Sequence, residues 1–291
     1  MISMEEQIEV RIMNNGSQIP TIGFGAYQLG SPEECEKTIS QALESGFRLI
    51  DTAAMYGNEV SIGRAIKHNP LSRHDIFVTS KIWHTDAGYD ATMKAVERSL
   101  SNFDFDYIDM MLIHQPIGDY YGSWRALENL YDQGCIRAIG VSNFYEDRLV
   151  DLLAHCHIPP AVNQVECHLY NQRDSLLTLM RNYNIIMQAW SPFTRHKINV
   201  FNNAALQVLS EKHGKSPAQI TLRWLLQRGI IALPKSSSPA HIQENYAIFD
   251  FSLSKMDMAL LSYQNEDHYL ENHHTATGIQ RLLEKTFPHN T

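Results

Sequence analysis

The sequence predicts one (β/α)8 barrel built from the whole chain, residues 1–291, with a β-hairpin ahead of the barrel and a short C-terminal tail after it. Three observations favour this fold class. Eight short apolar runs recur along the chain, and each is too short for a typical helix. Segments with the apolar spacing of helices lie between the runs. The chain length of 291 residues suits a barrel of roughly 250 residues with additions at both ends. The runs lie at 21–25, 47–50, 76–79, 108–113, 136–141, 161–165, 185–189 and 230–233.

The first predicted element is a hairpin over residues 10–20. Asn14, Asn15 and Gly16 stand there between apolar flanks, and an Asn-Gly pair favours the tight turn of a β-hairpin. The eight apolar runs follow as barrel strands. They are continuous rather than alternating, as expected for parallel strands that are covered on both faces.

The helices between the strands are marked at both ends. Residues 31–34 and 216–219 each begin with Ser, continue with Pro, and have Glu or Gln three residues after the Ser. This pattern predicts a capped helix start. Gly46, Gly134 and Gly229 each precede a predicted strand, where a helix commonly ends in a left-handed residue.

The composition excludes several classes of partner. The chain has 24 Lys+Arg against 32 Asp+Glu, a net charge of −8, and no apolar stretch close to the roughly 18 residues needed to cross a bilayer. Nucleic acids and anionic membranes favour clustered basic residues, so we expect neither as a partner. Residues 1–7 lack the basic and apolar regions of a signal peptide. We therefore expect a cytoplasmic protein, as a monomer or a weak dimer.

The four cysteines are expected to be reduced thiols, because an export signal is not recognised. The only cluster of metal-ligand types is residues 155–157 together with 167–168. Its ligand types are adjacent or alternate, and neighbouring residues on a helix do not face one another. We predict no metal site.

Polar side chains follow almost every predicted strand. In a parallel barrel the active site lies at the carboxyl ends of the strands, so these side chains are expected to meet at one mouth. The residues are Asp51, Lys81, His114, Ser142, Asn143, Gln164, Glu166, Trp190, Lys235 and Ser236.

Two kinds of chemistry could use this set. A Lys beside an acid and a His could form a Schiff base with a carbonyl substrate. Alternatively, Lys81 and Asp51 could adjust the pKa of Tyr56, which follows Asp51 by five residues and is placed to reach the mouth. An unperturbed Tyr, with a pKa of about 10, donates a proton poorly at neutral pH.

A phosphate site is predicted at residues 234–239. A strand there leads into a helix through Lys235 and three serines, with Ser238 as the expected cap and Pro239 in the first turn. Helix N-termini bind phosphate, and barrels often do so after their last two strands. The glycines near residue 25 are wrongly spaced for a dinucleotide-binding Rossmann motif.

Five motifs together resemble the aldo-keto reductase family. They are DTAAMYGNE (51–59), LIHQP (112–116), GVSNF (140–144), NQVE (163–166) and PKS (234–236). The resemblance runs in order from about Arg11 to Tyr263 and is strongest to the bacterial branch of 2,5-diketogluconate and methylglyoxal reductases.

The resemblance implies an NADPH-dependent reductase of aldehydes and ketones, including small dicarbonyls and keto-sugars. Its catalytic tetrad would be Asp51, Tyr56, Lys81 and His114. Tyr56 would be the general acid, Lys81 would lower the pKa of Tyr56, and His114 would orient the carbonyl.

The resemblance also implies the binding residues. The nicotinamide carboxamide would contact Ser142, Asn143 and Gln164, the nicotinamide ring Trp190, the adenosine phosphate Lys235, Ser236 and His241, and the adenine end Glu244 and Asn245. The carbonyl pocket would be lined by Tyr27, Met55, Trp83 and Gln115.

The chain departs from the family pattern at four places. His241 stands where the family often has Arg, which predicts a weaker preference for NADPH and some use of NADH. Gln115 replaces a common Trp, and Leu169 replaces a common Pro. The tail keeps the pair His273-His274 but lacks the Pro-Glu that usually follows.

Two alternatives to a reductase remain. One is a Schiff-base lyase of the same fold, and the other is a binding protein that keeps the cofactor fold without catalysis. The complete set of four tetrad residues counts against the second.

Overall fold

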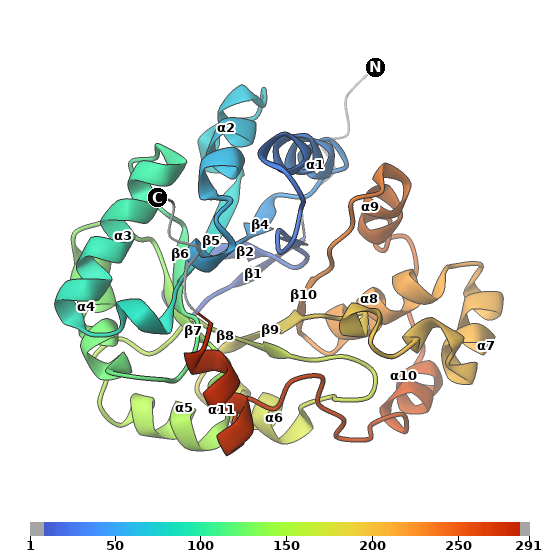
Figure 1. Ribbon diagram of the computed structural model, residues 1–291. Coiled ribbons are helices and arrows are strands. Elements are labelled where there is room, and N and C mark those ends of the chain that lie inside the picture. The colour runs from blue at the N-terminus through green and yellow to red at the C-terminus, as the bar shows by residue number, and fades with distance from the viewer. Residues whose placement is uncertain (1–8, 286–291) are drawn as a thin grey trace.

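Eight parallel strands form the centre of the computed structural model, which describes residues 9–285 (Figure 1). Their order in the sheet follows the chain without a crossover. The sheet closes on itself, because Gly23 N donates to Ala232 O and Gly25 N to Pro234 O, each at 2.9 Å. The strands are β3 (Phe24–Gly25), β4 (Leu49–Asp51), β5 (Phe77–Ile82), β6 (Met110–Ile113), β7 (Ile139–Ser142), β8 (Val162–Glu166), β9 (Ile186–Trp190) and β10 (Ile231–Leu233). The predicted (β/α)8 barrel is confirmed, and each predicted run overlaps a strand.

The N-terminal hairpin closes one end of the barrel. Strand β1 (Val10–Ile12) pairs antiparallel with β2 (Gln18–Pro20), as predicted. Met13 and Ile19 are buried, and they pack inside the barrel against residues that mostly lie where strands begin. These interior residues are Leu49, Met110, Leu112, Val162, Ile231 and Leu233. The open end is therefore the one where the strands finish.

Helices surround the strands, as Figure 1 shows. They are α1 (Pro32–Glu44), α2 (Glu59–His68), α3 (Tyr89–Phe103), α4 (Tyr120–Asp132), α5 (Glu146–Leu153), α6 (Asp174–Asn182), α7 (Ala204–His213), α8 (Pro217–Gln227), α9 (Pro239–Tyr246), α10 (Lys255–Ser262) and α11 (Ala276–Leu283). Both predicted capping boxes form, at the starts of α1 and α8. The three glycines predicted to end helices all have positive φ, from 77° to 106°. Ser238 begins α9 as predicted, but its side chain makes no cap hydrogen bond.

Neither a membrane span nor a metal site is found in the described part of the chain. No helix in residues 9–285 is long and apolar enough to cross a bilayer, and no group of ligand side chains there could hold a metal ion. The four cysteines are free. Two members of the cluster considered above are tied to the backbone near α5, since His155 Nδ1 contacts Asp151 O and Cys156 Sγ donates to Leu153 O.

Candidate active site

A cavity of about 990 Å³ opens where the barrel strands end. This volume is at the upper end of the range for small-molecule and cofactor sites. Every residue predicted for catalysis or binding lines it, with the exception of Lys81. Glu166, which was also expected at the mouth, is fully buried and does not line the cavity. The lining residues that were predicted are Tyr27, Asp51, Met55, Tyr56, Trp83, His114, Gln115, Ser142, Asn143, Gln164, Trp190, Lys235, Ser236, His241, Glu244 and Asn245.

Lys81 lies behind the cavity wall in a buried ion pair. Its Nζ donates to Asp51 Oδ2 and to Thr52 O, each at 2.7 Å, and both charged side chains are almost fully buried. Gln164 Nε2 donates to the other oxygen of Asp51, also at 2.7 Å. Burial lowers the pKa of Lys81, although Asp51 opposes the shift. An ammonium group held in this way is poorly placed to attack a substrate, so a Schiff base at Lys81 is disfavoured.

Tyr56 stands at the end of the 3-10 turn Ala54–Tyr56, directly after β4. Its ring is 4.8 Å from that of Tyr27 and 5.8 Å from that of His114. Lys81 Nζ is 5.4 Å from the ring centre. Burial and the negative charge of Asp51 raise the pKa of Tyr56. The net pKa of Tyr56 is therefore above its ordinary value in this structure, and the lowering contribution expected from Lys81 stays a prediction.

His114 follows β6 and is buried against an aromatic wall. Its ring meets the ring of Trp83 edge-on at 4.9 Å. Burial lowers the pKa of His114 well below the ordinary 6.5, and the charge of Lys81 adds to the shift. His114 is therefore a neutral imidazole at pH 7, which can donate a hydrogen bond without carrying a charge.

The residues predicted to hold the carboxamide already bond to one another. Asn143 has the left-handed φ of 63°, which Asn tolerates better than most residues. Its Nδ2 donates to His114 O at 3.0 Å, and its Oδ1 accepts from Trp190 Nε1 at 2.9 Å. Ser142 Oγ donates to Gln164 O at 2.9 Å. These hydrogen bonds fix the ring of Trp190 relative to the backbone of His114.

The predicted phosphate site lines the same cavity at the start of α9. Lys235 is exposed, and the Ser236 hydroxyl accepts from Ser238 N at 3.1 Å. The first turn of α9 has no side-chain cap, so its N–H groups remain available to an anion. His241 is exposed on this helix and lines the cavity.

The carbonyl pocket includes two of the departures from the family pattern. Gln115 is 3% exposed, and its Oε1 has no hydrogen-bond partner within the described residues. Its amide therefore gives the pocket a polar wall. Leu169 lies away from the cavity, fully buried in the main apolar core.

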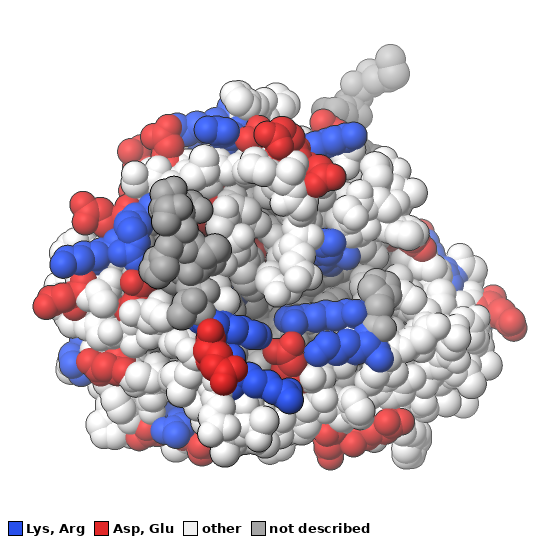
Figure 2. All heavy atoms as spheres, viewed as in Figure 1, with Lys and Arg blue, Asp and Glu red and all other residues white. Residues whose placement is uncertain are grey.

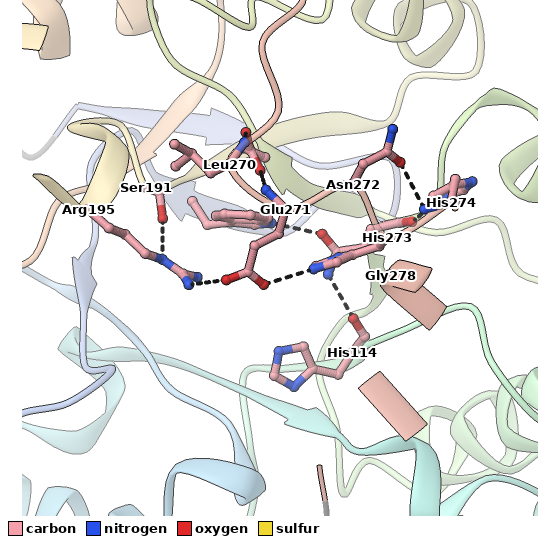
Figure 3. A network of polar contacts seen from close by, with 12 residues as sticks. His114, Ser191, Arg195, Leu270, Glu271, Asn272, His273, His274 and Gly278 are labelled. Carbon is pink, nitrogen blue, oxygen red and sulfur yellow. Dashed lines mark hydrogen bonds and ion pairs between the residues drawn. The ribbon is translucent and has the colours of Figure 1, made fainter. Parts of the chain in front are cut away.

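The structure adds site residues that the sequence had not indicated. Arg195, Glu271 and Lys285 line the cavity, together with His273 from the tail. Figure 3 shows Glu271 between two partners, Arg195 at 3.3 Å and His273 at 3.3 Å. The hydrogen bond from His273 and the charge of Arg195 lower the pKa of Glu271 to about 2. The pair His273-His274 was the only sequence signal for this group.

Basic side chains lie at the mouth although the chain has a net charge of −8. Figure 2 shows Lys and Arg side chains around the hollow at the centre of the molecule. Arg195, Lys235 and Lys285 line the cavity, and so do Asp51, Glu244 and Glu271. Asp51 and Glu271 are held in ion pairs, with Lys81 and Arg195. The exposed Lys235 could therefore meet a polyanionic cofactor.

Comparison with known proteins agrees with this arrangement. Residues 21–265 match the model of the aldo/keto reductase family. A glyoxal reductase from Bacillus subtilis is 42% identical over 256 residues, which cover 88% of this chain and 92% of that protein. The methylglyoxal reductase DkgA of Yersinia pestis is 39% identical, over 85% of this chain and 90% of the relative.

A solved structure extends the similarity to the fold. An aldo-keto reductase from Bombyx mori, crystallised in complex with NADP, superposes with a TM-score of 0.86 at 31% identity. The match covers 91% of this chain and 95% of the silkworm protein. The chain belongs to the aldo/keto reductase family and is an NAD(P)H-dependent oxidoreductase.

Proposed function

We propose that this protein reduces small dicarbonyls, aldehydes and keto-sugars to alcohols with NADPH, and that Tyr56 is the general acid. The observation that carries the proposal is the meeting of Tyr56 and His114 at the barrel mouth, in front of the buried pair of Lys81 and Asp51. The names of two relatives, a glyoxal reductase and a methylglyoxal reductase, support a small dicarbonyl as substrate.

The side chains of the cavity fit NADPH in kind. An uncapped helix start and the nearby Lys235 suit a phosphate, and the aromatic face of Trp190 suits a nicotinamide ring. Ser142, Asn143 and Gln164 would hold the carboxamide, Lys235, Ser236 and His241 the adenosine phosphate, and Glu244 and Asn245 the adenine end. When bound, the reduced nicotinamide supplies the hydride that the carbonyl carbon accepts.

Proton transfer is assigned to the protein. The Tyr56 phenol is protonated at neutral pH, and it gives this proton to the carbonyl oxygen as the oxygen becomes negative. Lys81 then stabilises the phenolate that remains, since its ammonium lies 5.4 Å from the ring. Neutral His114 donates a hydrogen bond that orients the carbonyl. Tyr27, Met55, Trp83 and Gln115 would surround the rest of the substrate.

A direct test follows NADPH consumption and alcohol formation together. We expect one molecule of alcohol to form for each NADPH consumed with glyoxals and with aromatic aldehydes. Keto-sugars are tested in the same assay. A purified, folded protein that oxidises neither NADPH nor NADH with any of these carbonyls would refute the proposal. Covalent trapping of substrate on Lys81 or Lys235 by borohydride would instead support a lyase.

The preference for NADPH is expected to be limited by His241. A neutral His offers a single donor to the adenosine phosphate, whereas Arg offers a charged, bidentate fork. We expect His241→Arg to raise the ratio of kcat/KM with NADPH to kcat/KM with NADH by about 10-fold. Gln243→Arg is the matched control, because it adds the same charge at an exposed position of α9 outside the cavity. A large ratio that His241→Arg leaves unchanged would contradict the assignment.

Protonation of His114 should not affect kcat/KM for carbonyl reduction near pH 6.5. Its pKa lies well below 6.5 in the folded protein, so the imidazole stays neutral as the pH falls through that value. We expect no decline in kcat/KM on the acid side of pH 6.5 that can be traced to His114. A decline with a midpoint near 6.5 that disappears in His114→Asn would show that the imidazole titrates normally.

A further inference from the structure

Glu166 is a buried carboxylate for which the proposed reaction has no use. It ends β8 and is 0% exposed, yet three donors reach it. His168 Nε2 lies 3.1 Å from Oε1, Leu270 N donates to Oε1 at 2.7 Å, and Glu271 N donates to Oε2 at 3.2 Å. The two backbone donors come from the tail, more than 100 residues further along the chain.

The Glu166 carboxylate is an acceptor for the backbone N–H groups of the tail. Burial raises the pKa of Glu166, but the hydrogen bonds from His168 and from the two tail amides outweigh burial, and the net pKa is lowered. The group is therefore an ionised acceptor at neutral pH. Hydrogen bonds to a charged acceptor are roughly twice as strong as those between neutral groups.

Residues 270–285, here called the strap, cross the barrel mouth from this anchor. In the middle of the strap, His274 stacks on Tyr145 at 3.7 Å, and its Nε2 lies 3.1 Å from Asn143 O. At the far end, Lys285 O accepts from Trp83 Nε1 at 2.9 Å. The strap therefore links the ends of β8 and β7 to the loop after β5.

The strap supplies part of the cavity wall. Glu271, His273, Leu282 and Lys285 line the cavity, and His273 stacks near the ring of Trp190. Figure 3 shows Glu271 between Arg195 and His273. Trp83, a residue of the carbonyl pocket, donates to Lys285 O and so joins this pocket to the strap.

We propose that Glu166 is a positioning residue, whose carboxylate fixes the start of the strap and thereby sets the affinity for the carbonyl substrate. The proposal rests on the proposed function, because it concerns the substrate of that same site. It predicts an effect on KM that is separate from kcat and from cofactor binding.

Glu166→Gln tests the anchor directly. A glutamine offers one acceptor oxygen, and its NH2 group faces an N–H donor where the carboxylate had its second oxygen. We expect KM for the carbonyl to rise by about 10-fold. We expect kcat at saturating substrate, and the Kd of NADPH measured by protein fluorescence, to stay within about twofold of wild type.

A second pair of variants tests the same contact from the tail and leaves the barrel untouched. Leu270→Pro removes the N–H that reaches Oε1, whereas Leu270→Ala keeps it. We expect Leu270→Pro to raise KM as Glu166→Gln does, and Leu270→Ala to remain close to wild type. Amide hydrogen exchange in residues 271–275 should accelerate in Glu166→Gln and Leu270→Pro alone.

Three results would overturn the proposal. One is unchanged exchange in the strap, because Glu166 would then not be its anchor. Another is faster exchange with an unchanged KM, because the strap would then not contribute to substrate binding. The third is a fall in kcat with KM unchanged, which would place the effect of Glu166 in β8 and its neighbour Gln164. If the wild-type protein reduces no carbonyl, the proposed function is refuted instead. The hydrogen-exchange rates of residues 271–275 would still show whether Glu166 anchors the strap.

Discussion

Tyr56→Phe is expected to lower kcat for carbonyl reduction by about 10³-fold, because general acid catalysis commonly contributes 10²–10⁴-fold. The variant removes one hydroxyl and keeps the ring that packs against Tyr27 and His114. The Kd of NADPH and the thermal stability should change little, since the Tyr56 hydroxyl makes no hydrogen bond to another of the described residues, 9–285. Single-turnover reduction with pre-bound NADPH measures the chemical step without product release.

Tyr27→Phe is the control for this result. Tyr27 packs on Tyr56 at 4.8 Å and lines the same cavity, so the two variants remove equivalent atoms from neighbouring rings. We expect Tyr27→Phe to alter kcat by less than about threefold, as for a hydroxyl that takes no part in proton transfer. If Tyr56→Phe consumes NADPH at the wild-type rate, or if both variants lose activity equally, Tyr56 is not the proton donor.

The barrel and its mouth were predictable because both follow from local patterns. A continuous apolar run marks a strand covered on both faces, and the residue just after it lies at the open end, as Asp51 and His114 do. The capped starts of α1 and α8 follow from the side chains of four consecutive residues. These signals need no knowledge of distant contacts.

The tail residues and the electrostatics of the site could not be predicted in this way. Arg195 meets Glu271 across 76 residues of chain, and no local pattern marks such a pair. The direction of the Tyr56 pKa shift depends on how deeply the phenol is buried and on how near it lies to the charge of Asp51. Both are consequences of packing, so the sequence motif that names the four residues does not determine their charges.

The buried pair of Lys81 and Asp51 should contribute to folding and catalysis separately. Lys81→Met leaves Asp51 without its cationic partner. The site is buried, since the side chains of Lys81 and Asp51 are only 0% and 8% exposed. Removing one member of a buried ion pair costs about 3–5 kcal/mol of the free energy of unfolding. We expect a loss of this size in urea unfolding, together with a fall in kcat of at least about 100-fold.

The double variant Asp51→Asn with Lys81→Met separates the two effects. With no unpaired charge left, it should recover most of the lost stability, because neutral replacement of a buried pair is often nearly neutral for folding. Its kcat should stay low, since the cation that stabilises the Tyr56 phenolate is absent. An exposed pair, Lys67 with Asp104, provides the control, and its double variant Asp104→Asn with Lys67→Met should change stability by less than about 1 kcal/mol. If the buried double variant regains kcat along with stability, the pair serves the fold alone, and proton transfer from Tyr56 does not depend on the charge of Lys81.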